Sequence, residues 1–153
     1  MGDTTPIGAV GKGLVAGAIG TGAMTAYQMA VAKARDSGSS TVPAEVGKRV
    51  VRGVFQRRVS DERTDQINQA MHWGYGTSWG ALYGIAEASV DRSPVRHGLV
   101  LGALVWGASL IELPAMKLAP PVWEYPPAEL ALDVSYHLVY GVSVAVAFRA
   151  LRA

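Results

Sequence analysis

The stretch HWGYGTSWGALYGIAE, residues His72–Glu87, decides the fold of this 153-residue chain. As a helix with about 100° per residue, it sets five residues on one narrow stripe: His72, Gly76, Trp79, Tyr83 and Glu87. Gly76, Gly80 and Gly84 form a second stripe beside it. In water, each glycine would weaken the helix by about 1 kcal/mol relative to alanine. In a bilayer, glycine lets a second helix approach closely, so the pattern predicts a tightly packed transmembrane helix.

The composition of the whole chain is that of a small membrane protein. Half of the residues are apolar, 17% are charged, and there are 18 glycines. The mean hydropathy of +0.20 is held down by the polar segment 33–66. A net charge of +2, without basic residues interleaved with aromatic ones on a recognisable fold, gives no basis for nucleic-acid binding. The lack of cysteine excludes disulfides, thiolate metal sites and thiol nucleophiles.

Four apolar segments have the length needed to cross a bilayer. The first, Gly13–Ala32, carries no charged side chain and would be about 30 Å long as a helix. Polar or proline-rich breaks separate it from the next three segments, and Pro114 ends or kinks the third. The sequence thus predicts spans at 13–32, 67–90, 95–116 and 128–148.

The polar loop at 33–66 contains a segment with the composition of an amphipathic helix. This predicted helix, residues 41–58, places valines and Phe55 against lysines and arginines. Such a helix either lies in the headgroup layer of the membrane or packs its valines on the bundle with its other face in water. The sequence favours neither alternative.

These observations predict an all-α fold. We expect a polytopic transmembrane four-helix bundle, one membrane domain over residues 1–153, with the amphipathic surface helix in the first loop. Close packing of the spans is assigned to five glycines: Gly76, Gly80, Gly84, Gly98 and Gly102. The distribution of basic residues does not decide the orientation in the membrane, because the first loop and the opposite ends of the spans both carry them.

An alternating bundle gathers polar residues on one side of the membrane. There the first and third spans end and the second and fourth begin. We predict that five residues of this side converge in a polar pocket that opens toward the segment Trp123–Pro127: His72, Glu112, Glu129, Asp133 and His137. Such residues either bond the helices together, relay protons or ions, or hold a metal or haem. The spacing of Glu129, Asp133 and His137 suits ligands on one helix face, but the Glu-x-x-His pairs of di-iron bundles are missing. The identity of any metal is unknown, and no cofactor is predicted.

The later part of the chain resembles the YagU-like family of small bacterial inner-membrane proteins. The resemblance covers residues 67 to 142. It rests on these residues: His72, Tyr83-Gly84, Ala86-Glu87, Gly98 with Gly102-Ala103, Pro114, Leu118 to Pro121, Glu129 and His137. It implies a four-span inner-membrane protein with the long loop outside and both termini in the cytoplasm. It implies no reaction, cofactor or catalytic residue.

Three classes of function follow from these observations. The first is a non-catalytic structural or accessory component that forms a homo-oligomer or joins a larger membrane complex through its glycine faces. The second is a proton-coupled transporter or channel for a small solute, and the third is a metal- or haem-binding membrane protein. An enzyme is not favoured, and no catalytic residue is assigned. The partners expected in every case include the lipid bilayer and exclude nucleic acid.

Overall fold

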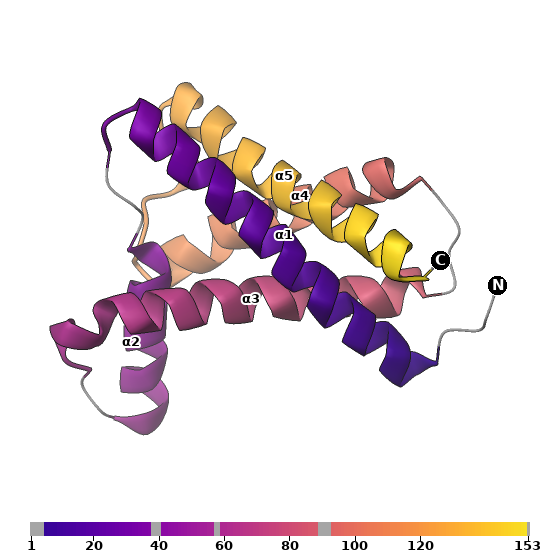
Figure 1. Cartoon of the computed structure of the whole chain (residues 1–153). Coiled ribbons are helices and arrows are strands. Elements are labelled where there is room, and N and C mark those ends of the chain that lie inside the picture. Colours follow the sequence, from indigo (N-terminus) through magenta and orange to yellow (C-terminus); the bar gives the residue numbers. More distant parts are fainter. Residues whose placement is uncertain (1–4, 38–40, 57–58, 89–92, 153) are drawn as a thin grey trace.

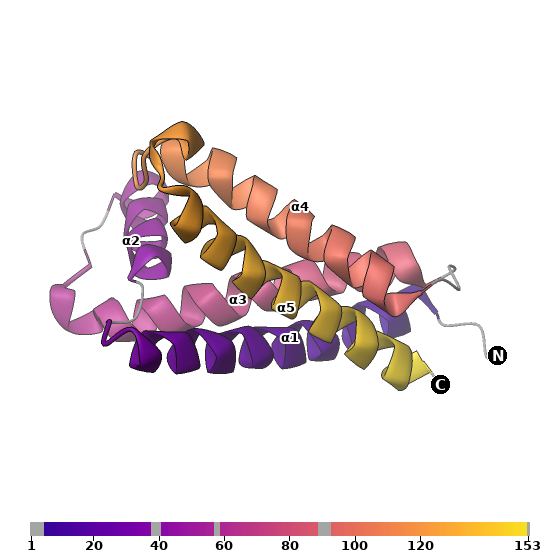
Figure 2. The same ribbon diagram turned by 90° about the horizontal axis from the view of Figure 1, so that it is seen from above.

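The computed structural model describes residues 5–37, 41–56, 59–88 and 93–152. Helices form the regular structure of these residues, as predicted. In chain order they are α1 (Pro6–Ala34), α2 (Val42–Phe55), the 3₁₀ turn η1 (Asp61–Arg63), α3 (Thr64–Glu87), α4 (Pro94–Ala115), the 3₁₀ turn η2 (Val122–Glu124) and α5 (Pro127–Arg152). The four long helices pack side by side as a bundle, and α2 lies across one end of it (Figures 1 and 2).

Local sequence sets where these helices begin and end. α1 begins seven residues before the predicted span, because Thr5 caps it by accepting a hydrogen bond from Gly8 N at 3.1 Å and Pro6 occupies the first turn. Proline also begins α4 and α5. α2 ends at a left-handed residue, Gln56, with φ of 53°. The predicted ends of the surface helix at 57–58 and of the second span at 89–90 lie outside the described residues.

The seam between α1 and α3 is built from backbone against backbone. The two helices run antiparallel, with Ala9 beside Gly84 and Gly17 beside Gly76. A Cβ atom added to Gly13 would lie 2.5 Å from the carbonyl oxygen of Gly80, and one added to Gly17 would lie 2.8 Å from that of Gly76. Only glycine allows this approach, so the glycine stripe of α3 faces α1 of the same chain.

α5 extends the bundle from α1 to α4. On the α1 side, Gly20 lies against Tyr140 and Val144. On the α4 side, Gly98 and Gly102 lie against the backbone of α5 from His137 to Val142. The buried core forms around α5 and contains Ala16, Tyr83, Leu101, Val105, Tyr140, Val144, Ala145 and Phe148. The order of packing is thus α3, α1, α5, α4, and contact between α3 and α4 is slight.

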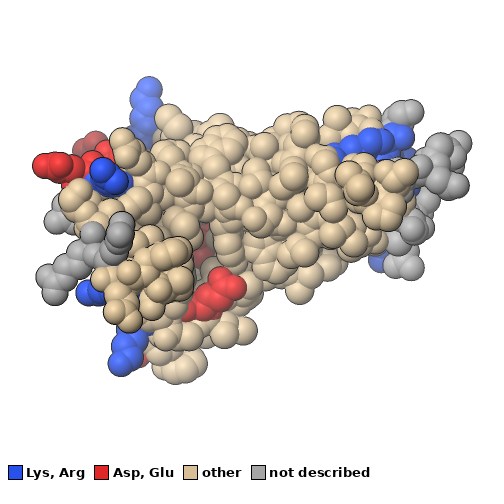
Figure 3. Space-filling view, turned by 90° about the horizontal axis from the view of Figure 1, so that it is seen from below, with Lys and Arg blue, Asp and Glu red and all other residues tan. Residues whose placement is uncertain are grey.

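Within the described residues, three helices are long and apolar enough to cross a membrane: α1, α4 and α5. α3 is the second predicted span, but composition does not single it out, because its first turns are polar and its glycines and aromatic residues add little hydropathy. On the face drawn in Figure 3, charged atoms gather at the two ends of the molecule and a long uncharged surface separates them. Acidic atoms also lie at a hollow in this face.

The α1–α3 seam makes a testable prediction about stability. Gly80→Leu should lower the free energy of unfolding by about 1–3 kcal/mol, because the new side chain has to push α1 away. A Cβ at Gly80 would already lie 2.5 Å from the carbonyl oxygen of Gly13. Unfolding in mixed detergent micelles measures the change. Gly74→Leu on the same helix is the matched control, since a Cβ there meets nothing within 4 Å. Equal stability of the two variants would contradict this packing.

Candidate functional site

The end of the bundle nearest α2 carries most of the predicted polar residues. There α1 and α4 end and α3 and α5 begin, as an alternating bundle requires. The ion pair between Arg35 and Glu129, 3.5 Å from Nη2 to Oε1, joins the end of α1 to the start of α5. Both side chains are about half exposed, at 47% and 53%, so this pair sits at the surface rather than inside the bundle.

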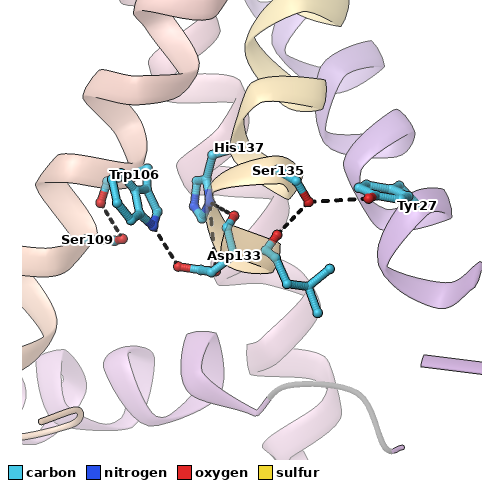
Figure 4. A network of polar contacts seen from close by, with 7 residues as sticks. Tyr27, Trp106, Ser109, Asp133, Ser135 and His137 are labelled. Carbon is cyan, nitrogen blue, oxygen red and sulfur yellow. Dashed lines mark hydrogen bonds and ion pairs between the residues drawn. The ribbon is translucent and has the colours of Figure 1, made fainter. Parts of the chain in front are cut away.

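Asp133 and His137 form the centre of the site, one turn apart on α5 (Figure 4). The indole nitrogen of Trp106 on α4 donates a hydrogen bond of 2.9 Å to Asp133 Oδ2. His137 Nδ1 lies 3.9 Å from Asp133 Oδ1. The Asp133 side chain is 48% exposed and that of His137 only 13%. The Asp133 carboxylate is therefore half exposed on the outside of the bundle, whereas the His137 imidazole is largely covered.

The hydrogen bonds of His137 fix which ring nitrogen carries a hydrogen. Its Nδ1 lies 2.9 Å from the backbone carbonyl oxygen of Asp133. A carbonyl oxygen can only accept, so Nδ1 carries the hydrogen in this contact. Nε2 is then the nitrogen of the neutral ring that can accept a hydrogen bond.

His72 enters the same half of the bundle from α3. Its Nε2 lies 3.0 Å from the Thr25 hydroxyl on α1. That hydroxyl donates to the carbonyl oxygen of Thr21 at 2.8 Å, so it accepts from His72. About one turn beyond both histidines, the hydroxyl of Tyr140 on α5 donates to the Gly76 carbonyl oxygen on α3. His72 and His137 therefore lie at a similar depth in the bundle.

Glu112 connects α4 to α3 at the edge of the site. It accepts a hydrogen bond of 3.1 Å from the hydroxyl of Tyr75, and both residues are exposed. The ring of Tyr75 lies edge-on to Trp79, with centroids 6.2 Å apart. This is a direct side-chain link between two helices that otherwise make little contact.

The predicted segment Trp123–Pro127 leads into α5, the helix that carries Asp133. Burial raises the pKa of the Tyr125 phenol above its ordinary value, and the nearby charge of Asp133 raises it further. Trp123 is 81% exposed, as suits an aromatic residue at headgroup level.

The five residues of the predicted pocket thus have four kinds of surroundings. Asp133 and His137 contact each other, His72 bonds to Thr25, Glu112 binds Tyr75, and Glu129 pairs with Arg35. Among the described residues, no three His, Asp or Glu side chains are grouped closely enough to hold a metal ion.

Sequence reasoning missed Trp106 and Tyr75 as polar partners, because aromatic residues in spans are usually packing or interface residues. Trp106 lies in the middle of α4, away from both interfaces where tryptophan is most common. That position was the available signal for a hydrogen-bonding role. The sequence offered no such signal for Tyr75.

The opposite end of the bundle has a polar contact of its own. Glu87 at the end of α3 accepts a hydrogen bond from His97 Nδ1 near the start of α4. Arg152 Nη1 donates to the backbone carbonyl oxygen of Glu87 at 2.7 Å. These contacts connect the ends of three helices, at the end of the bundle opposite the start of α5 and Asp133.

The bond between Trp106 and Asp133 predicts a measurable coupling. In a double-mutant cycle of Trp106→Phe and Asp133→Leu, we expect a coupling of about 0.6–1.7 kcal/mol in the free energy of unfolding, the range for hydrogen bonds between membrane helices. The control cycle combines Thr77→Val with Asp133→Leu. The Thr77 hydroxyl bonds only carbonyl oxygens of its own helix, so no coupling with Asp133 is expected. Coupling of the same size in both cycles would contradict the specific bond.

Residues 46–146 match the family described as "Protein of unknown function (DUF1440)". This range contains α3, α4, Asp133 and His137, and it includes the residues that carry the resemblance to YagU-like proteins. No curated protein and no solved structure matches the chain. Because the match covers more than half of the sequence, the chain belongs to the DUF1440 family of proteins of unknown function.

Proposed function

We propose that this protein is a four-pass component of the bacterial inner membrane that binds and transfers protons through Asp133 and His137. The observation that carries the proposal is a half-exposed carboxylate on a helix apolar enough to cross a membrane, 3.9 Å from a shielded imidazole. The inner-membrane location follows the resemblance stated above. It also implies that the end bearing α2, and with it the site, faces outward.

A four-pass protein requires α3 to cross the membrane together with α1, α4 and α5. At 24 residues, α3 is about 36 Å long, enough to cross the hydrocarbon core. Its contacts with α1 extend from Gly84 beside Ala9 to His72 beside Thr25. If α1 crosses the bilayer, a helix packed along it over this distance has to cross as well.

The cost of placing an acid in the membrane supports a functional role for Asp133. An acid at the centre of a spanning helix costs about 2.5–3.5 kcal/mol on insertion scales and less toward the helix ends, and acids within spans mark proton and ion pathways. Asp133 lies about 9 Å along α5 from Pro127, and His137 lies about 15 Å along it. A proton entering from the α2 end would therefore meet the carboxylate first and the imidazole second.

The other half of the bundle supports access from one end only. Beyond His137, Tyr140 donates a hydrogen bond of 2.6 Å to the Gly76 carbonyl oxygen, and the core residues Val144 and Phe148 are fully packed. Release of the proton on the far side requires a rearrangement of this packed half.

The accessory role expected from the sequence has less support. In that role, the glycine faces would bind a partner. In the structure, the glycine faces of α1, α3, α4 and α5 contact one another within the chain. A homo-oligomer or larger complex would need a different surface, and it stays a prediction. The same holds for the metal- or haem-binding alternative.

Proton flux into liposomes tests the proposed function. Purified protein is reconstituted with a pH-sensitive dye in the lumen, and a potassium diffusion potential drives protons inward. Wild type should acidify the lumen faster than protein-free liposomes do. Asp133→Asn should reduce the flux to the protein-free rate, because asparagine cannot hold the proton.

Thr77→Val is the control and should retain wild-type flux, since the Thr77 hydroxyl bonds only its own helix. Equal rates in wild-type and protein-free liposomes, or full flux in Asp133→Asn, would contradict the proposal. Circular dichroism and a monodisperse elution profile establish that each variant is folded.

A further inference from the structure

The second half of α2 exposes apolar and basic side chains together. Val50 is 43% exposed, Val54 68% and Phe55 66%. Arg49 and Arg52 lie in the same two turns. A soluble helix would turn these valines and the phenylalanine toward the bundle, so this surface needs another explanation.

The first half of α2 is fixed to α3. The backbone nitrogen of Ala44 donates a hydrogen bond of 3.0 Å to Asn68 Oδ1. Gly47 is buried against Ile67 and Met71. The contact therefore covers Ala44 and Gly47 but leaves the second half of the same apolar face uncovered.

The position of α2 along the bundle puts this uncovered surface at the membrane boundary. Ile67 and Met71 lie in the first turns of α3, at the end where Arg35 pairs with Glu129 at the surface. The axis of α2 runs across that of α3 (Figure 1). A helix that crosses a spanning helix at its end lies along the plane of the membrane.

We propose that the second half of α2, residues 49–55, docks on the acidic phospholipid headgroups of the membrane that the bundle crosses. Val50, Val54 and Phe55 enter the boundary of the hydrocarbon. Arg52 is three residues before Phe55 and is therefore its neighbour on the helix surface, so it extends from the edge of this face to the phosphate groups, while Arg49 lies on the polar side of the helix. The partner follows from charge complementarity, because an apolar face with an arginine at its edge matches an acidic headgroup layer over hydrocarbon.

The sequence contains no cysteine, so a single spin label reports on one position without further changes. The label is attached to Val54→Cys in the full chain, reconstituted in vesicles of equimolar phosphatidylcholine and phosphatidylglycerol. Power saturation compares collisions with oxygen, which concentrates in lipid, and with a water-soluble nickel chelate. At Val54 we expect oxygen to dominate. At Glu45→Cys, an exposed position among polar side chains, the nickel chelate should dominate.

The arginines are tested in the Val54→Cys background. Arg52→Gln should shift the equilibrium of the label from lipid toward water by about fivefold, the effect of one basic residue at an acidic surface. Vesicles of phosphatidylcholine alone should shift it in the same direction. Arg149→Gln removes another exposed charge, at the opposite end of the bundle, and should have no effect.

Two results would overturn the proposal. Dominant collisions with the nickel chelate at Val54 would show a solvated helix. Dipolar broadening between labels at Val54 would show that a second copy of the chain covers the face instead. Neither readout depends on proton flux, so the lipid contact and the proposed function fail separately.

Discussion

The contact of bare backbone between α1 and α3 is the constraint on which the rest of the structure depends. Hydrophobic burial drives little association between helices in lipid, so close van der Waals packing has to replace it. Gly13 and Gly17 on α1 meet Gly76, Gly80 and Gly84 on α3 at distances that exclude any side chain. This approach fixes the register of the two helices. Through Gly20, it also brings α1 against Tyr140 and Val144 of α5.

Tight packing at one end of the bundle leaves the polar residues at the other. At the end of the bundle where both chain termini lie, glycines, Val144 and Phe148 fill the space between the helices. Toward α2, larger polar side chains replace them, and hydrogen bonds such as Trp106 to Asp133 and Tyr75 to Glu112 connect the helices instead. A group that exchanges protons needs contact with water, and at the α2 end the half-exposed carboxylate of Asp133 provides it. The packing gradient thus separates a structural half from a chemical half.

Sequence alone predicted the helices and most of the polar side chains at the α2 end, since the length of an apolar segment and the positions of its charges are local properties. It did not predict their pairing, which depends on how each helix is rotated. Glu129 shares a face of α5 with Asp133, yet it pairs with Arg35 because α1 extends past the predicted span to the start of α5. Trp106 became a hydrogen-bond donor to Asp133 because Gly102 lets α4 approach α5 one turn earlier. Neither arrangement can be read from residue spacing within one helix.

The central claim is that α3 crosses the membrane although its composition does not mark it as a span. Single cysteines at Gln66 and Ala86, exposed positions near opposite ends of α3, test it most directly. Right-side-out membrane vesicles are treated with a membrane-impermeant maleimide before and after permeabilisation. The account predicts that one position reacts before permeabilisation and the other only after it, with Gln66 outside. Reaction of both positions on the same side would contradict the four-span bundle.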